Sequence, residues 1–282
     1  MLLGTSGFAT VISPRTADAL GLPRQKSALE IIDQSRDYSS DYVNVPFKIG
    51  RLSSNAVGMI ILPSDRDLGW GGTSVDGLLA PDILHNYDID IDFGTGKLNF
   101  ILQDHCPGRV VYWPATAVAA VPMQRFTHNW IVIPIKLDGQ STLAIIDTGV
   151  ATSTLYRGTA ERVFGLKVGD PDTPAIGNSS ARPELMVYRH TFKTLEFEGV
   201  AVSNPNVLII PDLLKNTKSS HSDAGTGTLF TNSELDEESI RMRIGMDVLR
   251  HFHVYIAYKE HVLYLTPAGQ PADKAAGNGT NP

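Results

Sequence analysis

Two stretches of the chain, residues 2–22 and 145–166, repeat the same order of apolar, polar and glycine residues. Each opens on an apolar pair, passes through a turn of small residues, and reaches a second apolar patch. Each then shows the pattern of a brief helix that stops at Gly-Leu, because glycine commonly follows the last turn of a helix. A repeat with a spacing of about 140 to 165 residues predicts two copies of one structural module.

Short strand patterns fill both copies. Residues 42–49 alternate between apolar and polar, and residues 57–62 form a continuous apolar run, as half-buried and fully buried strands do. In the second copy, the pattern of residues 130–137 is followed by Asp138-Gly139 and another strand, which predicts a hairpin. Long helical patterns are sparse. The sequence therefore predicts an all-β protein with a few short helices.

Composition excludes several classes of protein. A chain of 282 residues with 42% apolar content can bury a full core. The net charge of −6 and the lack of a basic run argue against a nucleic-acid partner. No apolar run approaches the roughly 18 residues of a membrane span. The single cysteine, Cys106, excludes an internal disulfide.

The second copy contains the most informative motif of the chain. The apolar run of residues 143–146 ends in Asp147, Thr148 and Gly149, and small or polar residues follow. This pattern predicts a buried strand that delivers Asp147 to a tight turn, where glycine allows a close approach of another backbone or a ligand. A plain strand-to-turn junction, in which Asp147 only caps the turn, is the structural alternative.

The motif resembles the active-site loop of aspartic peptidases of the pepsin and retropepsin type. The resemblance implies that two such loops meet and hold one water between two carboxylates, one acting as base and the other as acid. It implies that Thr148 hydrogen-bonds across to the other loop, and that Ile244 and Gly245 pack beside the Asp147 loop. It requires no metal and no organic cofactor. Val150 after the motif favours bacterial retropepsin-like, two-lobed members.

The resemblance covers most of the chain and implies a two-lobed fold of β-barrel type. We expect an N-terminal lobe over residues 1–104, a linker over 105–124 and a C-terminal lobe over 125–268. Residues 269–282 should form a disordered tail. Within the C-terminal lobe, residues 215–239 are rich in small, polar and acidic residues, which predicts a mobile surface loop.

The first copy lacks the acid. In the shared register Gly4 takes the place of Asp147, Thr5 matches Thr148, and Ser6 replaces Gly149. Leu79-Ala80 also fits the apolar-pair-and-glycine pattern less well than its later counterpart does. The strand hairpin that precedes Asp147 has no equivalent before Gly4. A truncated first lobe, a misplaced start and a true loss of the acid all remain open.

These observations lead to two function hypotheses. The first is an aspartic-type endopeptidase, in which Asp147 and a partner carboxylate that is missing here activate water against a peptide or protein substrate in the inter-lobe cleft. General acid–base partners contribute about 10²- to 10⁴-fold each, so this chain alone should be feeble. The second is a catalytically impaired pseudoprotease that binds peptides.

Two copies could also pair their Asp147 loops, but we expect a monomer rather than a homodimer, because the chain already supplies a lobe to pack there. The compartment depends on residues before Met1, since a lost secretion signal would make the protein periplasmic or secreted.

Three alternating acids, Asp88, Asp90 and Asp92, share one face of a predicted strand and suggest a metal site. Ile89 and Ile91 interleave with them as a buried face, so we expect the acids to form a solvated face without metal. His251, His253 and residues 104–106 lack a second cluster at zinc-like spacing, and no metal is expected there either.

Overall fold

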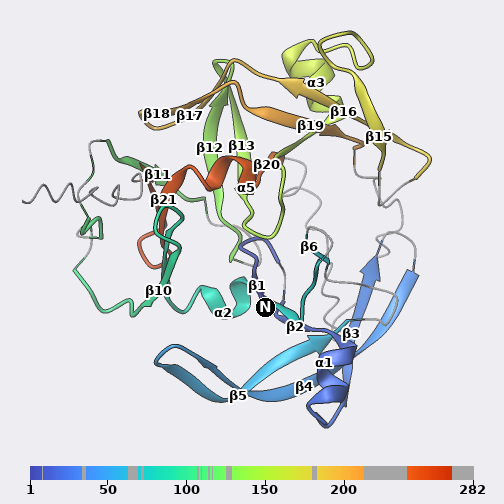
Figure 1. Cartoon of the computed structure of the whole chain (residues 1–282), viewed down its shortest axis with the longest axis vertical. Coiled ribbons are helices and arrows are strands. Elements are labelled where there is room, and N and C mark those ends of the chain that lie inside the picture. Colours follow the sequence, from blue (N-terminus) through green and yellow to red (C-terminus); the bar gives the residue numbers. More distant parts are fainter. Residues whose placement is uncertain are drawn as a thin grey trace, which may run out of the picture.

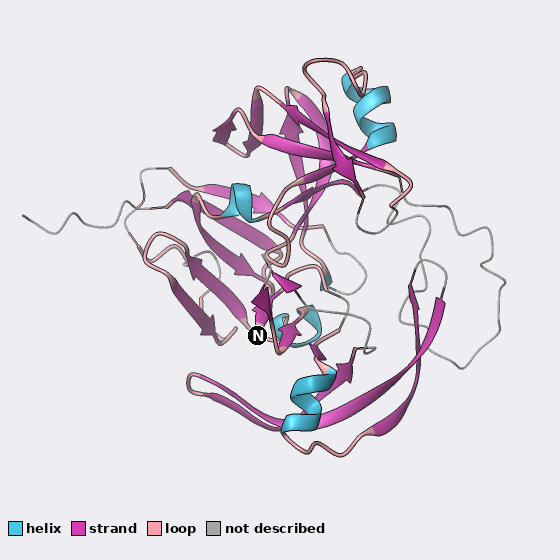
Figure 2. Ribbon diagram, turned by 45° about the vertical axis from the view of Figure 1, so that its right-hand side comes forward, coloured by secondary structure: helices cyan, strands magenta, loops and turns pink. Residues whose placement is uncertain are grey.

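The computed structural model describes residues 1–7, 9–33, 36–62, 69–70, 73–106, 108, 110–113, 115, 117–124, 129–179, 183–212 and 240–268. These residues form mainly strands with a few short helices (Figures 1 and 2), which confirms the expected all-β fold. The predicted surface loop over 215–239 and the predicted tail over 269–282 lie outside the described residues. No helix among the described residues is long and apolar enough to cross a membrane.

A six-stranded sheet contains only strands from residues 2–79. In spatial order it consists of β1 (Leu2–Leu3), β8 (Gly77–Leu79), β2 (Val11–Ile12), β5 (Leu52–Ile61), β4 (Arg36–Ile49) and β3 (Gln25–Asp33). Helix α1 (Pro14–Ala19) follows β2, and Ser13 caps it by accepting a hydrogen bond from the Thr16 backbone N–H. Strands β6 (Gly69–Trp70) and β7 (Thr73–Ser74) form a separate pair.

A nine-stranded sheet contains the strands around Asp147. In spatial order it consists of β15 (Ala175–Asn178), β16 (Met186–Thr191), β19 (Asn206–Ile210), β14 (Thr154–Tyr156), β20 (Ile240–Ile244), β13 (Gln140–Ile146), β12 (Val132–Leu137), β17 (Thr194–Phe197) and β18 (Val200–Ser203). The predicted hairpin is present, because β12 and β13 pair antiparallel across the turn at residues 138–139. Helix α3 (Arg157–Phe164) ends at Gly165, whose φ of 65° is left-handed.

A five-stranded sheet joins strands from both halves of the chain. Its order is β10 (Lys97–Ile101), β9 (Asp88–Asp92), β21 (Phe252–Ala257), β22 (Val262–Pro267) and β11 (Ala119–Pro122). The short helices α2 (Pro81–Leu84) and α5 (Met246–Leu249) precede β9 and β21. The junction is an antiparallel pair of β9 and β21, in which Tyr255 lies opposite Asp90.

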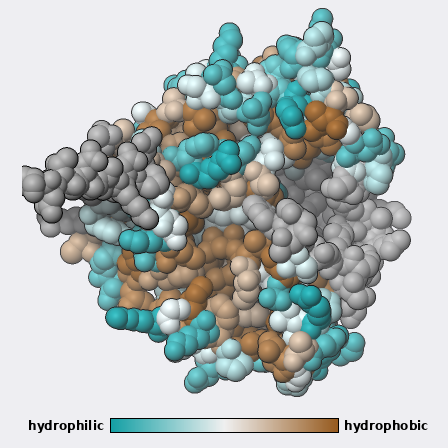
Figure 3. All heavy atoms as spheres, viewed as in Figure 1, coloured by the Kyte–Doolittle hydropathy of each residue, from teal (hydrophilic) through white to brown (hydrophobic). Residues whose placement is uncertain are grey.

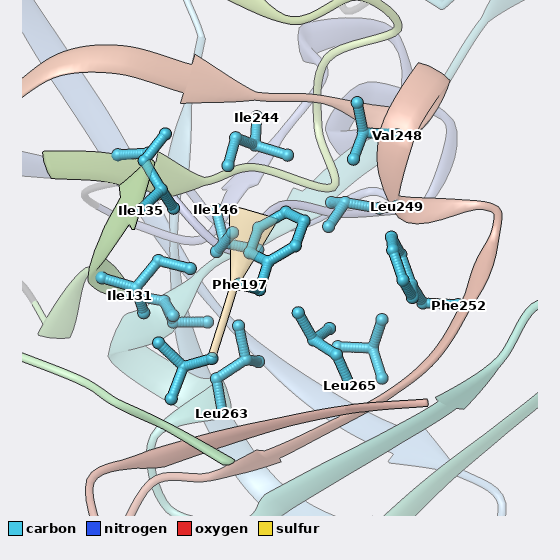
Figure 4. Close-up of a cluster of buried hydrophobic side chains, with 14 of the residues drawn as sticks. Ile131, Ile135, Ile146, Phe197, Ile244, Val248, Leu249, Phe252, Leu263 and Leu265 are labelled. Atoms are coloured by element: carbon cyan, nitrogen blue, oxygen red, sulfur yellow. The ribbon is translucent and has the colours of Figure 1, made fainter. Parts of the chain in front are cut away.

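The largest apolar cluster lies directly behind the Asp147 loop. Ile146 and Ile244 are both fully buried in it, on neighbouring strands, together with Phe197 and Val248 (Figure 4). On the molecular surface, apolar residues gather near the middle of the face in Figure 3. Because Ile146 immediately precedes Asp147, its packing fixes where the loop begins.

Two of the three alternating acids of β9 are buried and Asp92 is partly exposed, which corrects the expectation of a solvated face. Asp88 and Asp90 are both 0% exposed. Strand β9 lies inside the sheet, between β10 and β21, and side chains of the linker region cover the acids. Buried carboxylates need hydrogen-bond partners, and the sequence pattern alone did not reveal where these would come from.

Each buried acid pairs with a histidine. Asp90 lies 2.5 Å from His253 Nε2, and it accepts further hydrogen bonds from Asn99 and from the Tyr112 hydroxyl. Burial, together with the bond to Asp90, raises the pKa of Tyr112 to about 12. Asp88 lies 2.6 Å from His105 Nε2. Among the described residues, no group of three or more ligating side chains is placed to hold a metal ion.

The Asp88–His105 pair should make stability depend on pH. The hydrogen bond to the Asp88 carboxylate raises the pKa of His105 above its usual value. This stabilisation is therefore fully present below about pH 6.5 and is lost as the pH rises through the raised folded-state pKa. We expect the free energy of unfolding, measured by urea denaturation, to fall less between pH 6 and pH 9 in His105→Gln than in the native chain.

The exposed His251 supplies a matched control, because among the described residues its side chain makes no hydrogen bond or ion pair. His251→Gln should retain the native pH profile. Identical profiles for the native chain and His105→Gln would contradict the prediction.

Candidate active site

The loops of the two copies contact each other through a crossed set of hydrogen bonds. Thr5 Oγ1 donates to the Ile146 carbonyl at 2.7 Å and accepts from the Thr148 N–H at 3.1 Å. In the opposite direction, Thr148 Oγ1 donates to the Leu3 carbonyl at 2.5 Å. Thr5 is 0% exposed, so its hydroxyl lies away from water. The two threonines that the sequence aligned with each other therefore hold the loops together.

Asp147 lies at the centre of this contact and is almost completely buried. It is 3% exposed, and its backbone N–H donates to the Ile244 carbonyl at 2.9 Å. Carboxylate Oδ1 accepts from the Gly149 N–H at 2.7 Å. Oδ2 lies 2.7 Å from Arg243 Nη1 and forms an ion pair with it. Both oxygens of the acid are thus occupied, one by the backbone and one by a guanidinium group.

The glycines at the site allow close backbone approach. A Cβ atom on Gly149 would lie 3.5 Å from the Gly4 Cα, which places the two loops side by side. A Cβ atom on Gly245 would lie only 2.8 Å from the carbonyl carbon of Thr152, so a side chain there would force the loop to shift. The structure thus brings Gly4, Thr5, Thr148, Gly149, Ile244 and Gly245 together around Asp147. Ser6 adjoins them, but its side chain makes no hydrogen bond to the described residues.

Strand register reveals one residue pair that the sequence analysis did not identify. Ile145 lies opposite Arg243, and Leu2 lies opposite Leu78 in the same way, two residues before Asp147 and Gly4 respectively. Aligning Leu79-Ala80 with Ile244-Gly245 also aligns Leu78 with Arg243, so the correspondence of these two residues could be found in the sequence. The sequence does not show that the Arg243 side chain reaches Asp147.

Leu78 occupies space beside Gly4. A Cβ atom on Gly4 would lie 2.7 Å from Leu78 Cδ1 and 3.3 Å from its Cγ. In one loop, therefore, the Asp147 carboxylate pairs with Arg243, whereas in the other loop Gly4 has no side chain and Leu78 packs beside it.

Each loop is also supported by a carboxylate that the sequence analysis overlooked. Asp82 accepts from the backbone N–H and the hydroxyl of Thr10, and the Thr10 hydroxyl accepts from the Ala80 N–H at 3.1 Å. Thr10 is fully buried. Thr10 lies six residues after Gly4, and Asp82 lies two residues after Ala80.

In the second copy, Asp247 accepts from the backbone N–H and the hydroxyl of Ser153, and the Ser153 hydroxyl accepts from the Gly245 N–H at 3.0 Å. The same three contacts therefore occur beside Gly4 and beside Asp147. These contacts fix the loops relative to the helices that follow. Neither Asp82 nor Asp247 serves as a second acid beside Asp147, because each is bonded to the hydroxyl residue of its own loop.

A comparison with protein families matches part of the second half of the chain. Residues 133–248 match a protein family described as aspartyl protease. A solved retropepsin-like aspartic protease from Rickettsia conorii is similar over 55% of this chain and 96% of that chain, with 14% sequence identity and a TM-score of 0.37. No curated protein is similar enough to match.

The crossed hydrogen bonds should be important for stability. Thr5→Val keeps the shape of the side chain but leaves the Ile146 carbonyl and the Thr148 N–H without a partner in a buried place. We expect it to lower the free energy of unfolding by about 2 to 4 kcal/mol, whereas Thr5→Ser, which keeps the hydroxyl, should cost less than half of that. Urea denaturation measures both, and equal losses in the two variants would contradict the assigned role of the hydroxyl.

Proposed function

The chain belongs, through residues 133–248, to the aspartic peptidase superfamily, and from this premise we propose that it binds extended polypeptides at the Asp147 loop without hydrolysing them. The proposal combines the contact between the two loops with the absence of a second acid in that contact among the residues that the structure describes. Extended peptides bind through main-chain hydrogen bonds with additional side-chain pockets. Neither of these requirements depends on a pair of carboxylates.

The ion pair of Asp147 and Arg243 is the observation that carries this proposal. Hydrolysis by an aspartic dyad needs two carboxylates that share a proton, one to activate the water and the other to protonate the product. In this chain Gly4 aligns with the missing acid, and Leu78 packs against it. Arg243 takes the place of a second carboxylate beside Asp147. A guanidinium group remains protonated, so it cannot act as the base.

We further propose that the two lobes arose by duplication, with residues 1–104 and 125–268 as the repeated units and 105–124 as the connection. The matching contacts of Thr10 with Asp82 and of Ser153 with Asp247 support this proposal. The polypeptide ligand would then lie where the two loops meet. No metal or cofactor enters this function, and one copy of the chain supplies both loops.

Peptide hydrolysis is the second candidate function, since the loop that carries Asp147 is favourable for it. The acid is buried, Gly149 donates to it, and Thr148 bonds across to the other loop. A carboxylate supplied from elsewhere would complete the dyad. Pairing of two copies is one source, and it would make activity rise with protein concentration.

Cleavage of an unfolded protein at mildly acidic pH separates the two candidates. The native chain and Asp147→Asn should both leave the substrate intact, whereas a labelled extended peptide should bind the native chain in fluorescence anisotropy. Cleavage by the native chain that disappears in Asp147→Asn would replace binding by hydrolysis as the function. Absence of both binding and cleavage would contradict the two candidates together.

Restoring the acid should create hydrolytic activity. The variant Gly4→Asp with Leu78→Ala and Arg243→Leu supplies the second carboxylate, makes room for it and removes the arginine from Asp147. We expect peptide cleavage at least about 100-fold above that of the native chain, the lower limit for a general acid–base partner. Adding Asp147→Asn to this variant is the control and should abolish the gain. A gain that survives in the control would show that Asp147 is not the acid involved.

A further inference from the structure

We propose that Arg243 and Arg241 make this site selective for polypeptides that carry an acidic side chain next to an apolar one. The inference rests on the proposed binding function and names the chemical class of its ligand. It depends on three features of the site: an arginine with unused donors, a second, partly exposed arginine two residues away on the strand, and an apolar counterpart on the other loop.

Arg243 retains hydrogen-bonding capacity after pairing with Asp147. A guanidinium group has five N–H donors, and the contact with Asp147 Oδ2 engages Nη1. The side chain is 39% exposed, whereas that of Asp147 is 4% exposed. The pair is therefore asymmetric, with the acid inside and the arginine at the surface. Planar N–H forks of this kind bind carboxylates in preference to neutral amides.

Arg241 places a second guanidinium group near Arg243 on β20. The strand has a register shift against β13 between Ile240 and Met242, so strict alternation does not hold there and burial identifies the solvent side. Both arginines are partly exposed, whereas Met242 and Ile244 are 2% and 0% exposed, in the core. Arg241 is partly exposed, and among the described residues its side chain makes no hydrogen bond or ion pair.

The net charge of Asp147, Arg241 and Arg243 together is consequently positive, whereas that of a pair of carboxylates is negative. A single acid, Asp147, forms an ion pair with Arg243, and a second guanidinium group lies two residues away on β20, in a chain whose formal net charge is −6. A site with two carboxylates repels an acidic ligand, whereas this arrangement attracts one. Because both arginines lie near the surface, salt should weaken the attraction.

The loop of residues 4–6 contains no charged side chain. Leu78 takes the register position of Arg243 and packs against Gly4, where the counterpart of Asp147 would be. Since the two loops touch, a bound chain would meet a basic half and an apolar half in succession. An acidic residue followed or preceded by an apolar residue matches that order of surfaces.

The test compares short, end-blocked peptides in fluorescence anisotropy with the full chain. The probe is an extended peptide of alternating Val and Thr with one central Glu-Leu pair, and its partner carries Gln-Leu instead. We expect the Glu peptide to bind about tenfold more tightly than the Gln peptide at low salt, as for a charge-assisted hydrogen bond, with a smaller ratio at high salt.

Matched variants locate the effect. Arg241→Gln removes a partly exposed group that makes no hydrogen bond or ion pair with the described residues, so it should fold normally and lose most of the preference for Glu. Arg51→Gln removes the same charge from the exposed turn between β4 and β5 and should retain the full preference. Arg243→Gln combined with Asp147→Asn removes the ion pair without stranding the acid and should also lose the preference.

Equal affinity for the Glu and Gln peptides would overturn the selectivity while leaving peptide binding intact. An unchanged preference in Arg241→Gln would overturn the role of the second arginine in it. Failure of every peptide to bind would overturn the binding function and the selectivity together.

Discussion

The crossed hydrogen bonds between Thr5 and Thr148 are the contact on which the arrangement of this protein depends. They join two loops separated by more than half of the chain, and each threonine uses its hydroxyl to satisfy backbone groups of the other loop. A buried N–H or carbonyl without a partner is costly, so the loops can hardly separate without loss of stability. The packing of Ile146 and Ile244 behind Asp147 then determines the position of the acid.

This contact is preserved although the chemistry on either side of it differs. In the first loop a glycine and a leucine occupy the positions at which the second loop has an aspartate and an arginine. The residues that hold the two loops together therefore differ from those that set the chemistry of the site. The hydroxyl groups of Thr5 and Thr148 hold the loops, whereas Arg243 and Leu78 lie beside Asp147 and Gly4.

The five-stranded sheet provides the second connection between the two halves of the chain. Its central acids, Asp88 and Asp90, are buried and paired with His105 and His253, and Trp113 stacks on the His253 ring at 3.7 Å. The linker region thus packs against the junction of β9 and β21 through polar contacts. Satisfied buried networks of this kind specify one arrangement of strands, because a shifted register would leave their members without partners.

The sequence by itself determined the β-rich character of the chain, the hairpin before Asp147, the helix stop at Gly165 and the absence of an acid at Gly4. These follow from local alternation, turn chemistry and glycine conformation, which neighbouring residues decide. The tertiary structure alone decided that Arg243 reaches Asp147, that Leu78 packs on Gly4, and that Asp88 and Asp90 are buried. In each case the partner comes from a strand distant in the sequence, and periodicity describes only which side of a strand a residue faces. What lies opposite that side depends on how the sheets pair and pack.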